Sequence, residues 1–178
     1  APQMNEAEQP ATQNILLGLI DVVNAQAGVI YPNPGGLFAG VIARGIFYYE
    51  APDANGFMES LERFVTSVNG ADDGTVSLTS SYTTNAATIN GASADAYNIK
   101  IGFAGGRPGT PMMMYYGAPG GPSGHVAAGG RGVYMTTSPD QALMTKALGA
   151  AQAGAKTIGA EPQVEQVGSM LPANRTFE

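Results

Sequence analysis

Residues 110–152 read TPMMMYYGAPGGPSGHVAAGGRGVYMTTSPDQALMTKALGAAQ. The apolar run at 112–116 predicts a short buried strand. The segment 117–124 holds four glycines and two prolines, which weaken or interrupt strand pairing, so we expect an exposed, mobile loop there. The strand pattern returns over 126–137, so the two strands are predicted to pair as a hairpin around the loop.

The second half of this stretch predicts side-chain directions and a helix start. Successive side chains of a strand alternate between its faces, which places Val133 and Met135 on one face and Tyr134 and Thr136 on the other. Ser138 then reads as the N-cap of a helix, with Pro139 in its first position and Gln141 closing a capping box.

Upstream, apolar spacings of three and four residues predict a helix over 10–27, which Gly28 would end. A long apolar run predicts a central strand over 37–50. The helical periodicity is clearest over 56–68, where we expect a helix with its carboxylates on the solvent side.

The region between these helices and the opening stretch predicts a β-hairpin. Alternation over 75–88 is followed by Asn90-Gly91, a dipeptide suited to a tight hairpin turn, and by a return strand through Tyr97 and Ile99. A last helix is predicted after Pro162.

The order of these elements favours an α+β fold, with a mainly antiparallel sheet of about five strands and helices packed on one face. We expect residues 1–9 to form a flexible N-terminal segment, 10–172 a single α+β domain and 173–178 a free tail. A length of 178 residues suits one domain.

Charge argues against nucleic acid as a partner. The formal net charge is −6, and the eight basic residues are spread singly along the chain, so no basic patch is expected to bind phosphates or an anionic membrane surface. No apolar stretch reaches the roughly 20 residues that a spanning helix needs.

The chain has no cysteine, which excludes disulfides, zinc–thiolate sites and thiol chemistry. Together with the lightly charged composition, this favours a secreted, extracytoplasmic bacterial domain, periplasmic or at the cell surface. The chain begins at Ala1 and not at methionine, so we expect a processed or excised part of a larger precursor.

Catalytic and cofactor motifs are weak. His125 is the only histidine, and a hydrolase built around it would have to use Ser123 or Asp140. The glycine-rich segments lack the pattern of a phosphate-binding loop or a dinucleotide fingerprint. Asp72-Asp73-Gly74 lacks the spacing of a calcium loop. We therefore expect neither a cofactor nor a metal, and leave catalysis open while leaning against it.

Two ligand sites remain candidates. Arg107 and Arg131 each follow a Gly-Gly pair and could hold a small anion together. A small apolar or lipid-like ligand could lie between the helices and a concave sheet face, for which the lining residues would be Tyr97, Ile99, Phe103, Met113 and Tyr115.

The function expected first is a non-catalytic domain for protein–protein contact or self-assembly. The apolar-ligand module is the alternative, and the hydrolase around His125 comes third. Arg107, His125, Arg131, Tyr97 and Tyr115 are the candidate ligand-binding residues.

Overall fold

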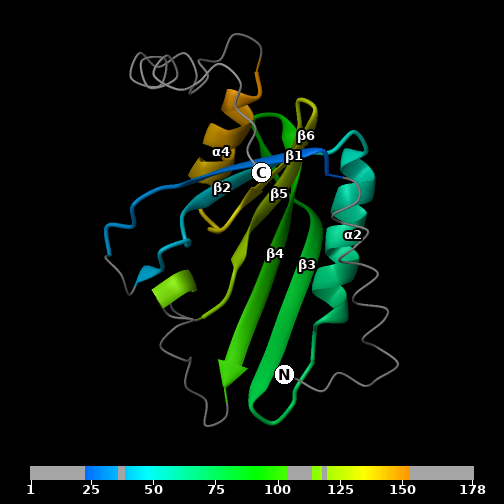
Figure 1. The fold of residues 1–178 in the computed structure, drawn as a ribbon. Helices are drawn as coiled ribbons and strands as arrows, with labels where there is room; N and C mark the ends of the chain where they lie inside the picture. The colour runs from blue at the N-terminus through cyan, green and yellow to red at the C-terminus, as the bar shows by residue number, and fades with distance from the viewer. Residues whose placement is uncertain (1–22, 36–38, 104–113, 118–119, 153–178) are drawn as a thin grey trace, which may run out of the picture.

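The computed structural model describes residues 23–35, 39–103, 114–117 and 120–152 (Figure 1). Within them the chain forms an open antiparallel sheet with packed helices. The elements in chain order are β1 (Ala25–Ile30), β2 (Gly45–Glu50), α2 (Ala54–Ser67), β3 (Val76–Ile89), β4 (Ala92–Phe103), β5 (Ser123–Gly129), β6 (Gly132–Thr136) and α4 (Gln141–Ala150).

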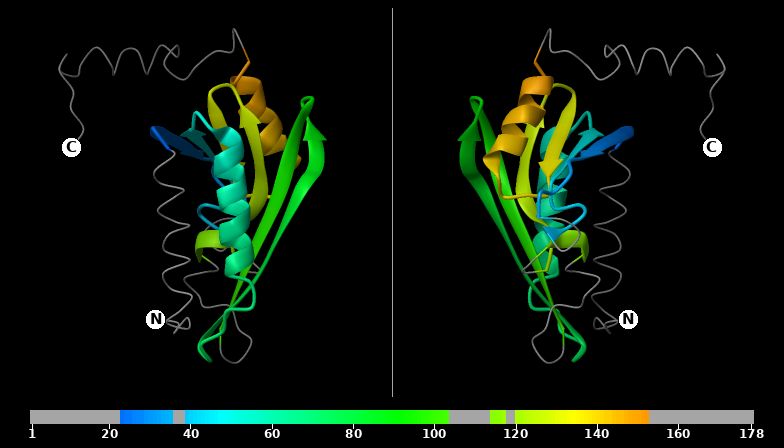
Figure 2. Two further views of the ribbon diagram at one scale, coloured as in Figure 1. Left: turned by 90° about the vertical axis from the view of Figure 1, so that its right-hand side faces the viewer. Right: turned by 90° about the vertical axis from the view of Figure 1, so that its left-hand side faces the viewer.

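The six strands lie in the order β1-β2-β6-β5-β4-β3, and every neighbouring pair is antiparallel. The outer strands are β1 at one edge and β3 at the other. Figure 2 shows β1, in dark blue, on the opposite side of the described fold from the green hairpin of β3 and β4. The prediction of a mainly antiparallel sheet is confirmed, with six strands in place of about five.

The predicted hairpin at Asn90-Gly91 is present. Asn90 has φ of 50° and Gly91 has φ of 80°, the left-handed values that a two-residue turn of this kind requires. The register shifts between Thr83 and Ala87, which marks a β-bulge in β3. Within this bulge Asn85 also has a positive φ of 52°.

The hairpin predicted around the glycine-proline loop is wrong. Residues 114–116 form a helical turn and not a strand, and 126–137 is not one strand, because the chain reverses at Gly130-Arg131 between β5 and β6. Gly130 has φ of 61° there. The four residues from Gly129 to Gly132 thus contain a turn where the sequence pattern predicts a continuous strand.

The described part of the loop is also not exposed. Gly120 and Gly124 are buried. The N–H of Ile99 donates to the Pro122 carbonyl at 2.8 Å, and the N–H of Ile101 donates to the Gly120 carbonyl at 3.2 Å. These bonds to β4 offset part of the cost of ordering the segment.

Helix α2 follows its predicted pattern closely. Asp53 caps it by accepting a hydrogen bond from the Gly56 N–H at 2.9 Å. The residues it buries, Phe57, Leu61 and Val65, are spaced four apart and so share one stripe. They pack against alternate strand residues, among them Tyr97, Val126 and Val133.

Helix α4 lies on the other side of the sheet. Its buried residues, including Leu143 and Met144, pack against Ala94 and Ala127. Ala127 is the direct neighbour of Val126 in β5, and adjacent strand residues point to opposite faces. Figure 2 shows α2 nearest the viewer in one view and α4 nearest in the reverse view. Helix α2 therefore covers one face, as expected for the helical layer, whereas α4 packs on the other face.

The start of α4 differs in detail from the prediction. Asp140, and not Ser138, is the N-cap, and its carboxylate accepts from the Ala142 N–H at 2.9 Å. Ser138 instead accepts from the Asp140 N–H at 3.2 Å. Both bonds satisfy backbone N–H groups at the start of the helix, and the N-cap lies two residues later than expected.

Near the N-terminus the boundaries shift. Residues 25–27, predicted as the end of a helix, begin β1, and Gly28 lies inside that strand. The strand predicted over 37–50 is confined to β2, because residues 41–44 form a turn. The segments 1–9 and 173–178, most of the first predicted helix and the whole of the last lie outside the described residues.

Candidate functional site

His125 is buried, with 7% of its surface exposed. It lies in β5 opposite Thr136 of β6, and its own N–H donates to the Thr136 hydroxyl at 3.0 Å. Among the described residues its ring Nδ1 has no hydrogen-bond partner. Burial lowers the pKa of this imidazole. The described residues therefore supply no oriented acid or nucleophile at this ring nitrogen.

Tyr97 lies on the α2 side of the sheet, away from His125. Its hydroxyl donates to the Thr136 carbonyl at 2.9 Å, and burial raises its pKa. Its ring packs with Phe57 and Leu61 in the core under α2. Side chains thus fill this part of the space in which an apolar ligand was expected.

The other predicted site residues do not join these two. Arg131 is exposed in the β5–β6 turn, where its guanidinium lies 3.4 Å from the Glu50 carboxylate. Such a surface pair contributes little to stability. Tyr115 is 55% exposed, and Arg107 lies outside the described residues, so the pairing of the two arginines stays a prediction.

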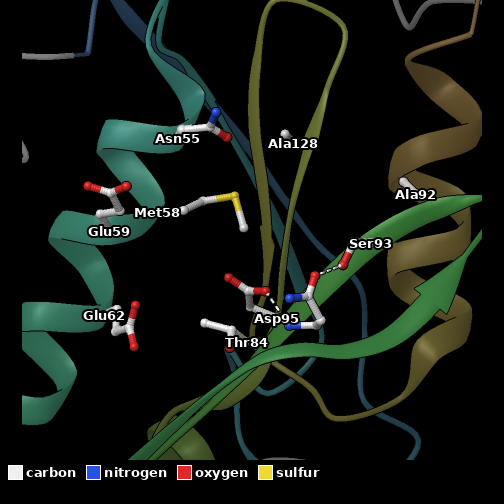
Figure 3. Close-up of a pocket in the computed structure, with 10 residues that line it drawn as sticks. Asn55, Met58, Glu59, Glu62, Thr84, Ala92, Ser93, Asp95 and Ala128 are labelled. Carbon is white, nitrogen blue, oxygen red and sulfur yellow. Dashed lines mark hydrogen bonds between the residues drawn. The ribbon is translucent and has the colours of Figure 1, made fainter.

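A cleft of about 510 Å³ opens between α2 and the β3–β4 hairpin (Figure 3). Glu59 and Glu62 of α2 line one wall, and Figure 3 shows Asp95 of β4 on the other, with the sulfur-containing side chain of Met58 between them. The remaining lining residues are Asn55, Thr84, Asn85, Ala92, Ser93 and Ala128.

Asp95 is the buried charge of this cleft, with 7% of its surface exposed. One carboxylate oxygen accepts from the Tyr82 hydroxyl and the other from the Asn85 N–H, both at 2.8 Å. Burial raises the pKa of Tyr82, and the hydrogen bond to Asp95 raises it further, so the phenol stays a donor. The hydroxyl of Ser93 donates to the Asn85 side chain.

Sequence reasoning missed Asp95, although a signal was present. Alternation puts it on the same strand face as Tyr97, so a carboxylate on the core side called for a partner. Its hydrogen bonds give it a structural role in the bulge of β3, because it binds Asn85, the bulge residue with a positive φ. The described residues contain no group of three or more possible metal ligands, and the two glutamates lie on the helix side of the cleft.

The two edges of the sheet differ in how their backbone groups are used. At the β3 edge, the loop after α2 lies alongside the strand. The N–H of Leu78 donates to the Ala71 carbonyl at 2.7 Å, and its carbonyl accepts from the Gly70 N–H at 2.9 Å. The N–H of Ser80 donates to the side chain of Asn69 at 2.9 Å. The first part of this edge is thus bonded to the chain's own loop, and the strand is interrupted further along by the bulge.

At the β1 edge, all six residues are exposed. The strand AQAGVI contains no charge and no proline, the two kinds of residue that most often protect an edge strand. Its last residues, Val29 and Ile30, are 41% and 46% exposed. The other large apolar side chains that the described structure exposes are Val41, Met114 and Tyr115.

Two backbone bonds bring these other apolar residues together. The N–H of Val41 donates to the Met114 carbonyl at 2.8 Å, and the N–H of Ile42 donates to the Tyr115 carbonyl at 3.0 Å. Residues 41–44 lead into β2, the neighbour of β1. We call β1 together with Val41, Met114 and Tyr115 the β1 surface.

Comparisons of this chain with protein-family models, curated proteins and solved structures returned no match. Neither α2 nor α4 has the length and apolar character of a membrane-crossing helix, and none was found elsewhere in the described residues.

Proposed function

We propose that this chain is a protein–protein contact domain that binds through the β1 surface. The supporting observation is the contrast between its two sheet edges: the chain's own loop bonds to β3, whereas β1 is exposed along its whole length. An exposed edge strand offers a row of N–H and C=O groups to an extended segment of a partner, and its exposed Val29 and Ile30 add apolar contact area.

The two other candidate functions have less support. An apolar ligand would need space under α2, where Tyr97 packs against helix side chains. A hydrolase would need a group that orients His125, and within the described residues its Nδ1 has none. The cleft beside Asp95 is an alternative place for a ligand, but both oxygens of that carboxylate already accept hydrogen bonds.

The proposed location of the protein rests on its composition. Absence of cysteine and a lightly charged chain support a place outside the cytoplasm, at the periplasm or the cell surface. We therefore expect the partner to be a protein of that compartment.

A photo-crosslinking amino acid at Ile30 tests the proposal in cells that naturally produce the protein. Irradiation should link the chain to a defined partner, which mass spectrometry identifies. The matched control carries the crosslinker at Glu59, an exposed residue of α2. Equal adducts from both positions, or none from position 30 at native expression levels, would contradict the assignment of the contact to β1.

A further inference from the structure

The hydrogen-bond pattern of β1 shows which of its backbone groups face outward. Tyr31 follows Ile30 and continues the β1–β2 register, and its N–H donates to the Arg44 carbonyl at 2.9 Å. Hydrogen-bonded and non-hydrogen-bonded pairs alternate along an antiparallel ladder. Ala25, Ala27 and Val29 therefore bond to β2, and the backbone N–H and C=O groups of Gln26, Gly28 and Ile30 point away from it.

The bonding of Gly45, which lies opposite Ile30, agrees with this phase. Gly45 directs its own backbone groups to the far side of β2. Its N–H donates to the Thr137 hydroxyl at 2.8 Å, and its carbonyl accepts from the Thr137 N–H at 3.0 Å. Ile30 and Gly45 therefore form a non-hydrogen-bonded pair between β1 and β2, as the alternation requires.

From this geometry we infer that the partner strand of β1 is the β1 of a second copy of the chain, a conclusion that rests on the proposed function. A two-fold axis perpendicular to the sheet keeps the faces of both copies aligned, so opposite residues must share a face. An axis through Gly28 satisfies this condition and pairs Gly28 with its copy, Gln26 with Ile30, and Ile30 with Gln26. All outward-facing backbone N–H and C=O groups of the two β1 strands are then hydrogen-bonded, within these three residue pairs.

The side chains fit the same arrangement. β1 contains no charged residue, so antiparallel self-pairing brings no like charges opposite each other within the strand even though the chain carries a net charge of −6. Ala27 comes to lie opposite Val29 of the other copy. A Cβ placed on Gly28 would lie 2.8 Å from the ring of Phe47, so this half-buried ring covers the glycine. At the axis the two Phe47 rings approach one another on the α2 side of the joined sheet.

A six-residue strand pair is a small contact, so the dimer should be weak and depend on concentration. Residue-resolved amide hydrogen exchange at about 5 µM and about 500 µM protein tests this prediction, with sedimentation equilibrium on the same samples. We expect the amides of Gln26, Gly28 and Ile30 to exchange more slowly, by a factor of about three or more, at the higher concentration, where sedimentation shows dimer. Ala27 and Val29, already bonded to β2, should change much less.

Two substitutions at Gln26 separate pairing from folding. Gln26→Pro removes an outward N–H and no bond to β2, whereas Gln26→Thr keeps the donor in a residue that favours strands. The proline variant should lose concentration-dependent protection and sediment as a monomer, and the threonine variant should keep both. If the proline variant unfolds, Ile30→Lys replaces it, because a charge on an exposed edge opposes pairing.

The outcomes also separate this inference from the proposed function. A monomer at both concentrations, with rapid exchange at Gln26, Gly28 and Ile30, overturns self-pairing and leaves the edge open to another protein. Slow exchange at the same three amides in a monomer shows that the edge is already covered by this chain, and then both proposals fail.

Discussion

The hydroxyl of Tyr82 donates a 2.8 Å hydrogen bond to Oδ2 of Asp95, and this bond joins the two long strands β3 and β4 beside the bulge. The other oxygen of Asp95 accepts from the N–H of Asn85, the residue with φ of 52°. A buried carboxylate thus satisfies both a phenol and a backbone donor. It holds a conformation that a residue with a side chain rarely adopts.

A double-mutant cycle measures this relationship. Asp95→Ala should lower the free energy of unfolding by about 1–3 kcal/mol, because it leaves the Tyr82 hydroxyl without its acceptor in a buried setting. Tyr82→Phe removes the donor, and in the double variant the two losses should not add, with a coupling of about 0.5 kcal/mol or more. Ser81→Ala, an exposed neighbour, is the control. Fully additive effects in denaturant titrations would mean that the bond does not stabilise the bulge.

The buried stripe of α2 predicts a second difference. Leu61→Ala should reduce the free energy of unfolding by about 2–5 kcal/mol, since it removes packing against the core under the helix. Glu59→Ala, on the exposed side of the same helix, should change it by less than about 0.5 kcal/mol. Similar losses from both, measured by urea unfolding, would show that the helix does not pack as described.

Two glycines should respond to alanine in opposite directions. Gly91 has φ of 80° with open space around it, so Gly91→Ala should destabilise the hairpin turn by about 1 kcal/mol through the backbone alone. Gly149 lies in α4, also with open space and without a positive φ. Gly149→Ala should therefore stabilise by about 0.5–1 kcal/mol. Thermal unfolding of both variants checks the signs, and a gain from Gly91→Ala would contradict the turn geometry.

His125 predicts a dependence of stability on pH. Burial lowers its pKa in the folded state below the ordinary value of about 6.5. The unfolded chain therefore takes up the proton first, and the free energy of unfolding should fall as the pH drops below about 6.5. Above that pH both states hold the neutral ring and the contribution is constant.

The control for this prediction is His125→Gln, which has no titrating ring. Subtracting the pH profile of its unfolding free energy from that of the unsubstituted chain removes the contribution of the carboxylates. The difference should decrease toward acid pH. A difference that stays flat between about pH 7.5 and pH 5 would show that the ring is equally basic in both states.

The sequence alone was sufficient for the elements whose signal is local. The apolar spacing of α2 depends on residues within a few positions of one another, and the Asn90-Gly91 turn depends on backbone preferences of two residues. The same holds for the faces of β6, since Val133 and Met135 lie on the α2 side and Tyr134 on the α4 side as alternation predicts.

The β1 surface and the cleft could not be found in this way. Residues 25–27 are predicted as the end of a helix, yet they form part of β1 because β2 offers them a ladder of hydrogen bonds. The turn at Gly130-Arg131 is visible in hindsight as Gly129-Gly130-Arg131-Gly132, but strand and turn patterns overlap there. Asp95 shows its partners only when β3 and β4 pair with a bulge between them.

What the sequence determined about this protein is therefore the type of its best-marked segments and which side chains of a strand share a face. The tertiary structure decided that β2 pairs with β6, that α4 lies across the sheet from α2, and that a loop bonds to the first part of β3 while β1 is exposed. The physical reason is the range of the interactions. Helix periodicity and turn preferences act between neighbours in the chain, whereas strand order and edge exposure depend on contacts between segments far apart in sequence, and those are settled only when the whole core packs.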